Sequence, residues 1–217
     1  GLNLDHIWII GCGRFGKIAI ERLCAQKGER TFVMVDKESC SDSGHLQNIK
    51  IIKDDGVLFL KKYLTRQNAP NWIIPALPVH LAAQWCMTDS GYMRVKRHPA
   101  PKDIKKLLPN PMSGKSGDIY TSMANFKCPD NCPEPEDHCP TTGKKREENL
   151  FDRLEKIKIP GFEMLVLRSR QLAPGVGGYR PGELFDLYEK LTEKPGKYLI
   201  ATSCRCHGAV TCVSVQL

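Results

Sequence analysis

An apolar run that turns directly into a spaced set of glycines constrains this chain more than any other feature. The run ends at Ile10, and the next six residues read Gly-Cys-Gly-Arg-Phe-Gly, with glycines at Gly11, Gly13 and Gly16. In such a strand–turn–helix unit the first glycine permits the tight turn, the second lets the backbone approach a phosphate, and the third lets the helix pack closely on the strand. The helix that we expect over residues 17–26 would direct its free N–H groups at that phosphate. The pattern therefore predicts a dinucleotide-binding unit.

A carboxylate after the next apolar run indicates the ligand. Asp36 follows the run over residues 31–35 and stands about 20 residues after Gly16, where it could accept hydrogen bonds from both ribose hydroxyls of an adenosine. This placement favours NAD over NADP. S-adenosylmethionine and other adenosine ligands stay open, as does a glycine turn that is purely structural. The residues expected to bind the cofactor NAD are Gly11, Gly13, Arg14, Phe15, Gly16, Asp36 and Lys37.

The N-terminal part of the chain resembles the NAD-binding domains of the TrkA/RCK family. The resemblance rests on residues 9–16, residues 35–37 and the later Asp-Asp-Gly at residues 54–56, and it covers roughly residues 5–75. Members of that family regulate potassium transport. The resemblance therefore implies a Rossmann-type nucleotide site and a transport protein as a partner, whereas the sequence beyond Pro75 departs from the family's pattern.

Alternating apolar runs and amphipathic segments predict an α/β fold, a Rossmann-like open parallel sheet with helices on both faces. We assign residues 1–98 to a Rossmann-type dinucleotide-binding domain. Residues 99–217 form a cysteine-rich metal-binding segment and a C-terminal strand–helix–strand unit, which could continue the same sheet. The elements expected in this second part are a helix over 145–157, a strand over 162–168, a glycine-rich loop over 170–178, a helix over 182–192 and a strand over 198–203.

A cysteine-rich segment without regular periodicity lies between these parts. Cys128, Cys132 and Cys139 are each followed by proline, and so polar a segment cannot bury enough apolar surface to hold itself together. In a reducing compartment the expected staple is a metal ion or cluster. The fourth thiolate must come from elsewhere, and we expect Cys206, or else Cys204.

Two metals suit such a ligand set. A 4Fe–4S cluster takes four thiolates, often with proline after a ligand. Zinc takes four thiolates, or three with His138 or His207, in a closed tetrahedral site. The repeated Cys-Pro pairs and the redox-type nucleotide site favour the iron–sulfur cluster over zinc, and thiols without metal are the third alternative. The cysteines expected as scattered, incidental thiols are Cys12, Cys24, Cys40 and Cys86.

Charge and hydropathy indicate which partners and which cellular location to expect for the protein. The formal net charge is +8, with basic runs over residues 94–106 and 144–146. Neither run has interleaved aromatic residues, so we expect solvated surface rather than a nucleic-acid site. No stretch of eighteen apolar residues occurs, so we expect no membrane span. Residues 1–6 lack a basic start and an apolar signal core, so we expect a cytoplasmic protein, which could form a homodimer.

Two functions follow as hypotheses. The first is an NAD(H)-binding protein with a cysteine-ligated metal centre in a redox or electron-transfer accessory role, which includes an NAD-dependent oxidoreductase. The alternative is a nucleotide-sensing regulatory module of TrkA/RCK type with a structural zinc site. His80, after the turn at Pro75 and Pro78, is expected either to contact a nicotinamide or a second ligand or, as the alternative, to start a helix, where it caps the helix or faces water.

Overall fold

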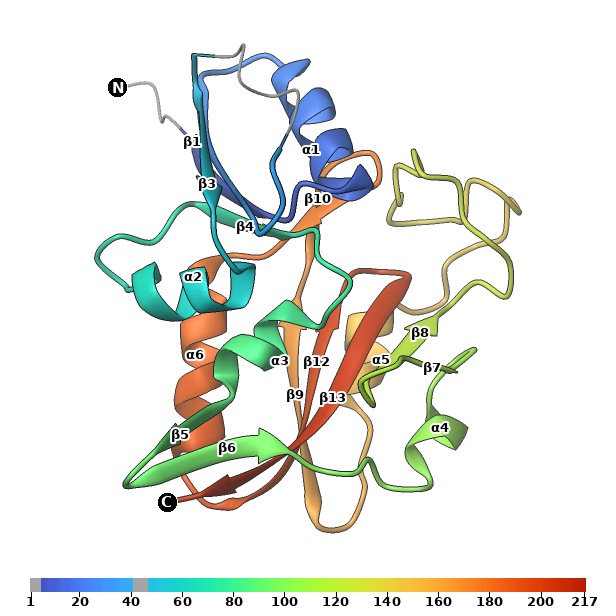
Figure 1. Ribbon diagram of the computed structural model, residues 1–217. Coiled ribbons are helices and arrows are strands. Elements are labelled where there is room, and N and C mark those ends of the chain that lie inside the picture. The colour runs from blue at the N-terminus through green and yellow to red at the C-terminus, as the bar shows by residue number, and fades with distance from the viewer. Residues whose placement is uncertain (1–4, 41–46) are drawn as a thin grey trace.

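Two β-sheets built from different parts of the chain organise the protein (Figure 1). The computed structural model describes residues 5–40 and 47–217. In Figure 1 the first sheet lies at the top in blue, the second lies below it in green to red, and the cysteine-rich loop extends beside helix α1 in yellow. The expectation drawn from the first six residues falls mostly outside the described part of the chain.

The first sheet is parallel throughout and has the strand order β3-β2-β1-β4. Its strands are β1 (Asp5–Ile10), β2 (Arg30–Asp36), β3 (Ile49–Lys53) and β4 (Trp72–Pro75). Four consecutive residues are buried in each of the two central strands, β1 and β2, which explains why both read as continuous apolar runs. The expected parallel sheet of the N-terminal part is confirmed.

Helices cover both faces of this sheet. They are α1 (Arg14–Cys24), α2 (Gly56–Tyr63) and α3 (Leu81–Cys86). Alternate side chains of β1 point to opposite faces, so Ile7 and Ile9 pack in the cluster that contains α1, while Trp8 and Ile10 pack in the cluster that contains α2 and α3. Asp55 caps α2 by accepting a hydrogen bond from the Leu58 N–H at 2.9 Å.

The second sheet is mixed. Its main path runs β5-β6-β13-β12-β9, and β8 and β7 extend it from β13. β9 and β12 pair in parallel, whereas the other pairs are antiparallel. The strands are β5 (Thr88–Ser90), β6 (Met93–Arg97), β7 (Met112–Ser113), β8 (Ile119–Ser122), β9 (Phe162–Arg168), β12 (Gly196–Ser203) and β13 (His207–Gln216).

Helices also sandwich the second sheet. They are α4 (Ile104–Leu107), α5 (Leu150–Glu155) and α6 (Pro181–Thr192). Tyr198 and Ile200 of β12 pack with α6 and α3, while Leu199 and Ala201, which alternate with them, pack with α4 and α5. The cluster around α3 and α6 also receives Trp8 and Val33 of the first sheet, so the two sheets share one core.

Three expectations are corrected by this arrangement. The chain changes sheet before residue 98, because β5 and β6 pair with the second sheet. The second sheet is separate from the first rather than its continuation. The glycine-rich loop over 170–178 is the hairpin of β10 (Arg170–Ala173) and β11 (Val176–Gly178). Its continuation reaches the first sheet, where Tyr179 and Ile73 exchange two backbone hydrogen bonds of 3.0 Å.

The helix expected over 145–157 is shorter than predicted. α5 spans Leu150–Glu155, and residues 146–149 before it have no regular secondary structure. The Arg146 N–H donates to the Asp137 carbonyl at 2.8 Å, and His138 and Lys145 form an isolated antiparallel bridge. These backbone groups are thus engaged by the cysteine-rich loop, which competes successfully with helix formation.

Candidate functional site

The glycine loop has the geometry that the sequence predicts. Gly11 has a φ of +122°, and a Cβ there would lie 2.5 Å from the Ala76 carbonyl oxygen. A Cβ on Gly16 would lie 2.0 Å from the Gly11 carbonyl oxygen. Gly13 differs, because no heavy atom lies within 4 Å of its Cβ position. Since Gly13 is the N-cap of α1, this open space lies in front of the helix N-terminus.

Asp36 is held against the same loop. Its carboxylate accepts hydrogen bonds from the Cys12 N–H at 2.7 Å and from the Glu38 N–H at 3.0 Å. Lys37 turns away toward α2, where its ammonium pairs with Asp55 at 2.8 Å, and this hydrogen bond raises the pKa of Lys37. Asp36 is therefore placed beside the loop, while Lys37 supports the start of α2.

Two cysteines expected as incidental thiols are joined. Cys12 and Cys40 form a disulfide with a Cα–Cα distance of 5.5 Å. The expectation of two free thiols is therefore wrong. The pairing arises because Asp36 ties the end of β2 to the glycine loop, which brings the residues after β2 next to Cys12.

The five cysteines expected to bind metal lie around a single cavity. Cys128, Cys132 and Cys139 come from the irregular loop between β8 and α5, and Cys204 and Cys206 come from the turn between β12 and β13. All five line a cavity of about 1100 Å³. The fold thus brings together segments that are far apart in sequence, although within residues 5–40 and 47–217 no three Cys, His, Asp or Glu side chains stand together as a preformed metal site.

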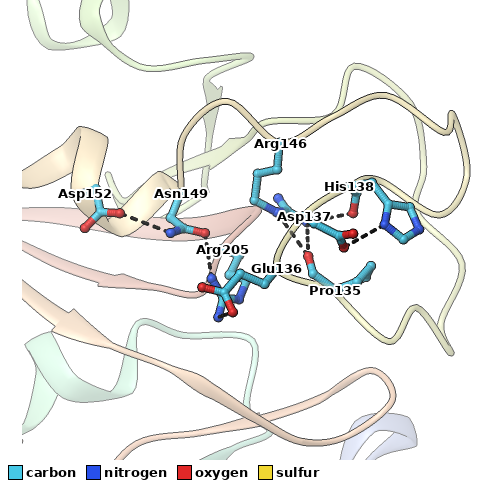
Figure 2. Close-up of polar contacts among 8 residues, drawn as sticks. All are labelled: Pro135, Glu136, Asp137, His138, Arg146, Asn149, Asp152 and Arg205. Atoms are coloured by element: carbon cyan, nitrogen blue, oxygen red, sulfur yellow. Dashed lines mark hydrogen bonds and ion pairs between the residues drawn. The ribbon is translucent and has the colours of Figure 1, made fainter.

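Both cysteines of the C-terminal turn contact the cysteine-rich loop, and Cys206 does so through Arg146 and Glu134, while Cys204 bonds only Glu134 of that loop. Arg146 donates to the Cys206 Sγ at 2.7 Å, and the Cys206 N–H donates to Glu134 at 3.0 Å. Arg146 also donates to the Pro135 carbonyl at 3.0 and 3.2 Å, and Figure 2 shows its guanidinium pointing at that carbonyl. The Cys204 Sγ also accepts the His207 N–H of its own turn at 3.3 Å.

The surroundings of the thiols set their acidity. Burial raises the pKa of the Cys128 thiol, and the neighbouring Cys132 and Cys206 raise it further. Hydrogen bonds from Thr142 lower the pKa of Cys139. Burial raises the pKa of Cys206 against the opposing effect of Arg146. The mutual repulsion of nearby thiolates is relieved when a metal cation binds them.

A chain of polar contacts links the cysteine-rich loop to α5 through the β12–β13 turn, and it begins with the ion pair of Glu136 and Arg205 at 3.8 Å (Figure 2). Arg205 of the β12–β13 turn donates to the Asn149 side chain at 2.9 Å, and Asn149 donates to Asp152 at 3.1 Å. His138, considered as an alternative ligand, pairs with Asp137 at 2.7 Å on the exposed side of the loop. Its ring is therefore engaged outside the group of thiols.

Sequence reasoning missed a buried polar network beside α3. His80 is only 3% exposed, and its ring nitrogens lie 2.7 Å from the Thr211 hydroxyl and 2.8 Å from the Thr202 hydroxyl. Thr211 donates at 2.5 Å to Asp118, which is fully buried and paired with Arg97 at 2.6 Å. His80 does start a helix, as the N-cap of α3, but the expectation that it faces water is wrong, since its ring contacts the second sheet. Burial lowers its pKa to about 4, with Asp118 opposing and Arg97 adding to the shift.

Comparison with known proteins places this α/β chain in a family. The chain belongs to the AF_1314_C family, described as "Uncharacterized protein, C-terminal domain", whose pattern matches residues 82–216. A protein of Archaeoglobus fulgidus, described as an uncharacterized protein, is 30% identical over 220 residues, which cover 94% of this chain and 96% of that protein. No solved structure matches the chain. In the described residues, every helix is too short or too polar to cross a lipid bilayer.

The family match begins within α3 and includes every strand of the second sheet. It therefore contains the cysteine-rich loop and the turn that carries Cys204 and Cys206. The glycine loop and Asp36 lie before the family match, and the alignment with the A. fulgidus protein covers 94% of this chain.

Proposed function

We propose that this protein binds NAD(H) at its glycine loop and holds a metal centre on Cys128, Cys132, Cys139 and Cys206, in a redox or electron-transfer accessory role. The proposal includes a Rossmann-type nucleotide site resembling that of the TrkA/RCK domains. One observation carries it. Phe15, in the first turn of α1, lines the same cavity as the cysteine thiols.

The shared cavity would let a bound dinucleotide reach toward the metal centre. In a Rossmann unit the pyrophosphate lies at the helix N-terminus, and the rest of the dinucleotide continues past it. Phe15 is 59% exposed at that terminus, so its ring is available to a bound ligand. A dinucleotide held by Gly13 and Asp36 would extend toward the cavity that the thiols line. The 4Fe–4S cluster is the centre that suits electron exchange there.

The hydrogen bonds of the C-terminal turn favour Cys206 over Cys204 as the fourth ligand. Cys206 is already in contact with Arg146 and Glu134 of the loop that carries the other three thiols. The Cys204 thiol is occupied by the backbone of its own turn. Arg146, as a fixed positive charge on the Cys206 sulfur, would stabilise that thiolate.

Electron counting requires a further partner. Hydride transfer from NADH moves two electrons, whereas an iron–sulfur cluster stores one. A partner protein that accepts electron pairs and passes single electrons would therefore complete the reaction. We expect such a redox protein as the partner of this chain.

The test combines optical and binding measurements on anaerobically purified protein. The proposal would be supported by a brown protein with broad absorbance at about 400 nm, by equal amounts of iron and sulfide, and by saturable binding of NADH. Colourless protein without metal would refute the metal centre. Unchanged intrinsic fluorescence and no calorimetric signal on addition of NADH would refute the nucleotide site.

A second function is favoured by the docking of the cysteine-rich loop on α1 and on the hairpin of β10 and β11. Arg22 of α1 donates to the Asp130 carbonyl at 2.7 Å, and Gln171 of β10 donates to the Cys132 carbonyl at 2.8 Å. A metal that only staples this loop would suit a nucleotide-sensing module with a structural zinc. One zinc per chain, no colour, and an NADH-dependent change in oligomeric state would favour this alternative.

A further inference from the structure

The backbone between the first two cysteines is fixed to the helix that follows the glycine loop. The Asp130 carboxylate forms an ion pair with Arg14, the first residue of α1. The Asp130 carbonyl accepts a hydrogen bond of 2.7 Å from Arg22, two turns further along the same helix. Asp130 therefore joins the middle of the segment 128–132 to α1 through both its side chain and its backbone.

The hairpin of β10 and β11 holds the other side of this segment. The Cys132 carbonyl accepts hydrogen bonds from the Gly175 N–H at 3.2 Å and from Gln171 at 2.8 Å. Gly175 has a φ of +70°, and a Cβ there would lie 1.8 Å from the Asp130 carbonyl oxygen. Arg22 also bonds the carbonyl of Pro174. Asp130 is thus enclosed by α1 and the hairpin, and its place depends on the segment that carries two thiols.

Arg14 has two competing anionic partners. It stands at the N-terminus of α1, where free N–H groups and the helix dipole attract phosphate. Its side chain is 65% exposed, so it can turn from a carboxylate to a ligand. While Asp130 holds the guanidinium, one positive charge is neutralised next to the phosphate position, and a carboxylate stands beside it.

We propose that Asp130 is a positioning residue that makes metal and dinucleotide binding antagonistic, by competing with the dinucleotide phosphates for Arg14. The inference rests on the proposed function. A metal on Cys128 and Cys132 would add to the hydrogen bonds that already hold the segment and so strengthen the Asp130–Arg14 pair. Loss of the metal would weaken this hold, and Arg14 would then turn more readily to the phosphate. Because coupling is reciprocal, bound NADH weakens the hold on the metal by the same factor.

The experiment measures NADH affinity in as-purified, metal-containing protein. Asp130→Asn keeps the size of the side chain and removes its charge, so NADH should bind about two- to fivefold tighter than in the wild type, the range of an exposed ion pair. The gain should shrink in about 0.5 M salt, because exposed charges are screened. Asp130→Glu should restore the wild-type affinity. The matched control is Asp89→Asn, which removes an exposed carboxylate paired with Arg94 at 3.1 Å and should change nothing.

Two further measurements separate the possible failures. Chelated wild-type protein should bind NADH more tightly than metal-containing wild type and no more tightly than Asp130→Asn, and Arg14→Gln should bind weakly and equally with and without metal. Unchanged or weaker NADH affinity in Asp130→Asn, in protein that still contains metal, would overturn the antagonism and leave the proposed function standing. Absence of NADH binding in wild type and in all variants would overturn the proposed function and the inference with it.

Discussion

Each glycine of the loop before α1 meets a different steric requirement. Gly11 and Gly16 are required by the fold itself, because a Cβ at either would overlap a backbone carbonyl. Gly13 is surrounded by open space, so the folded chain does not need glycine there. Under the proposed function, a ligand that occupies this space would be the physical reason for the missing side chain.

Binding and folding can be separated at these positions. Gly13→Val should leave the melting temperature close to that of the wild type and abolish NADH binding, because its branched side chain fills the phosphate position. Asp36→Ala should weaken NADH binding about tenfold or more through loss of the ribose hydrogen bonds. Gly16→Val serves as the control that fails to fold. Titration calorimetry and thermal melts check these outcomes, and wild-type affinity in Gly13→Val would show that the loop binds no dinucleotide.

The metal ligands are distinguished by single thiol replacements. Cys132→Ser and Cys206→Ser should lose the bound metal, whereas Cys204→Ser should retain it, because Cys206 is the thiol of the C-terminal turn that raises the pKa of Cys128, while the Cys204 thiol bonds Glu134 and the backbone of its own turn. Cys24→Ser is the matched control, since Cys24 is an exposed free cysteine of α1. Metal content is measured by plasma emission. Full occupancy in a variant without both Cys204 and Cys206 would contradict a cross-link between the loop and the C-terminal turn.

Among the secondary-structure elements, the local pattern of apolar residues predicts some helices and strands but none of the contacts between distant segments. β1, β2, β9 and α6 can be expected because their apolar residues follow the period of a strand or a helix. The hairpin of β10 and β11 resembles a loop in sequence, since its glycines suggest a turn and its second strand is very short. The docking of Asp130 on Arg14 spans 116 residues, and no local pattern reports such a contact. The same holds for His80, whose partners lie on β12 and β13.

Gly175 at the hairpin turn controls the docking of the cysteine-rich loop. Gly175→Ala should destabilise the protein by about 1–3 kcal/mol, because alanine disfavours a φ of +70° and its Cβ would overlap Asp130. The displaced loop should also be cut faster by protease between residues 124 and 149. Gly182→Ala is the control, since nothing lies within 4 Å of that Cβ position in α6. Equal stability and protection in both variants would show that the loop does not depend on the hairpin.

For the molecule as a whole, the network around His80 ties α3 to the second sheet. Three strands contribute to it, with Arg97 on β6, Thr202 on β12 and Thr211 on β13, and Asp118 lies just before β8. A neutral imidazole fits here because it can donate to one threonine and accept from the other. Protonation would remove the acceptor and place a charge in a buried site.

The stability of the protein should therefore fall in mild acid. The pKa of His80 is about 4 in the folded protein, against 6.5 for a histidine free in water, so the unfolded chain binds the extra proton between these values. The contribution of neutral His80 to the free energy of unfolding is complete above pH 6.5 and declines toward pH 4, by up to about 3 kcal/mol. Urea denaturation at several pH values checks this. His80→Gln should flatten the profile relative to the wild type, whereas His138→Gln, on the exposed side of the cysteine-rich loop, should not.

The position of β13 determines when the second sheet can form during synthesis. β13 pairs with β6, β8 and β12, yet its residues, His207–Gln216, are made after all three partners. The first sheet is complete by Pro75 and can close while translation continues. The thiols of the loop between β8 and α5 then wait, unshielded, until the turn with Cys206 has left the ribosome. At the proposed metal centre, metal insertion would consequently be a late event, and the nascent chain would expose the thiols of the loop until the turn with Cys206 is made.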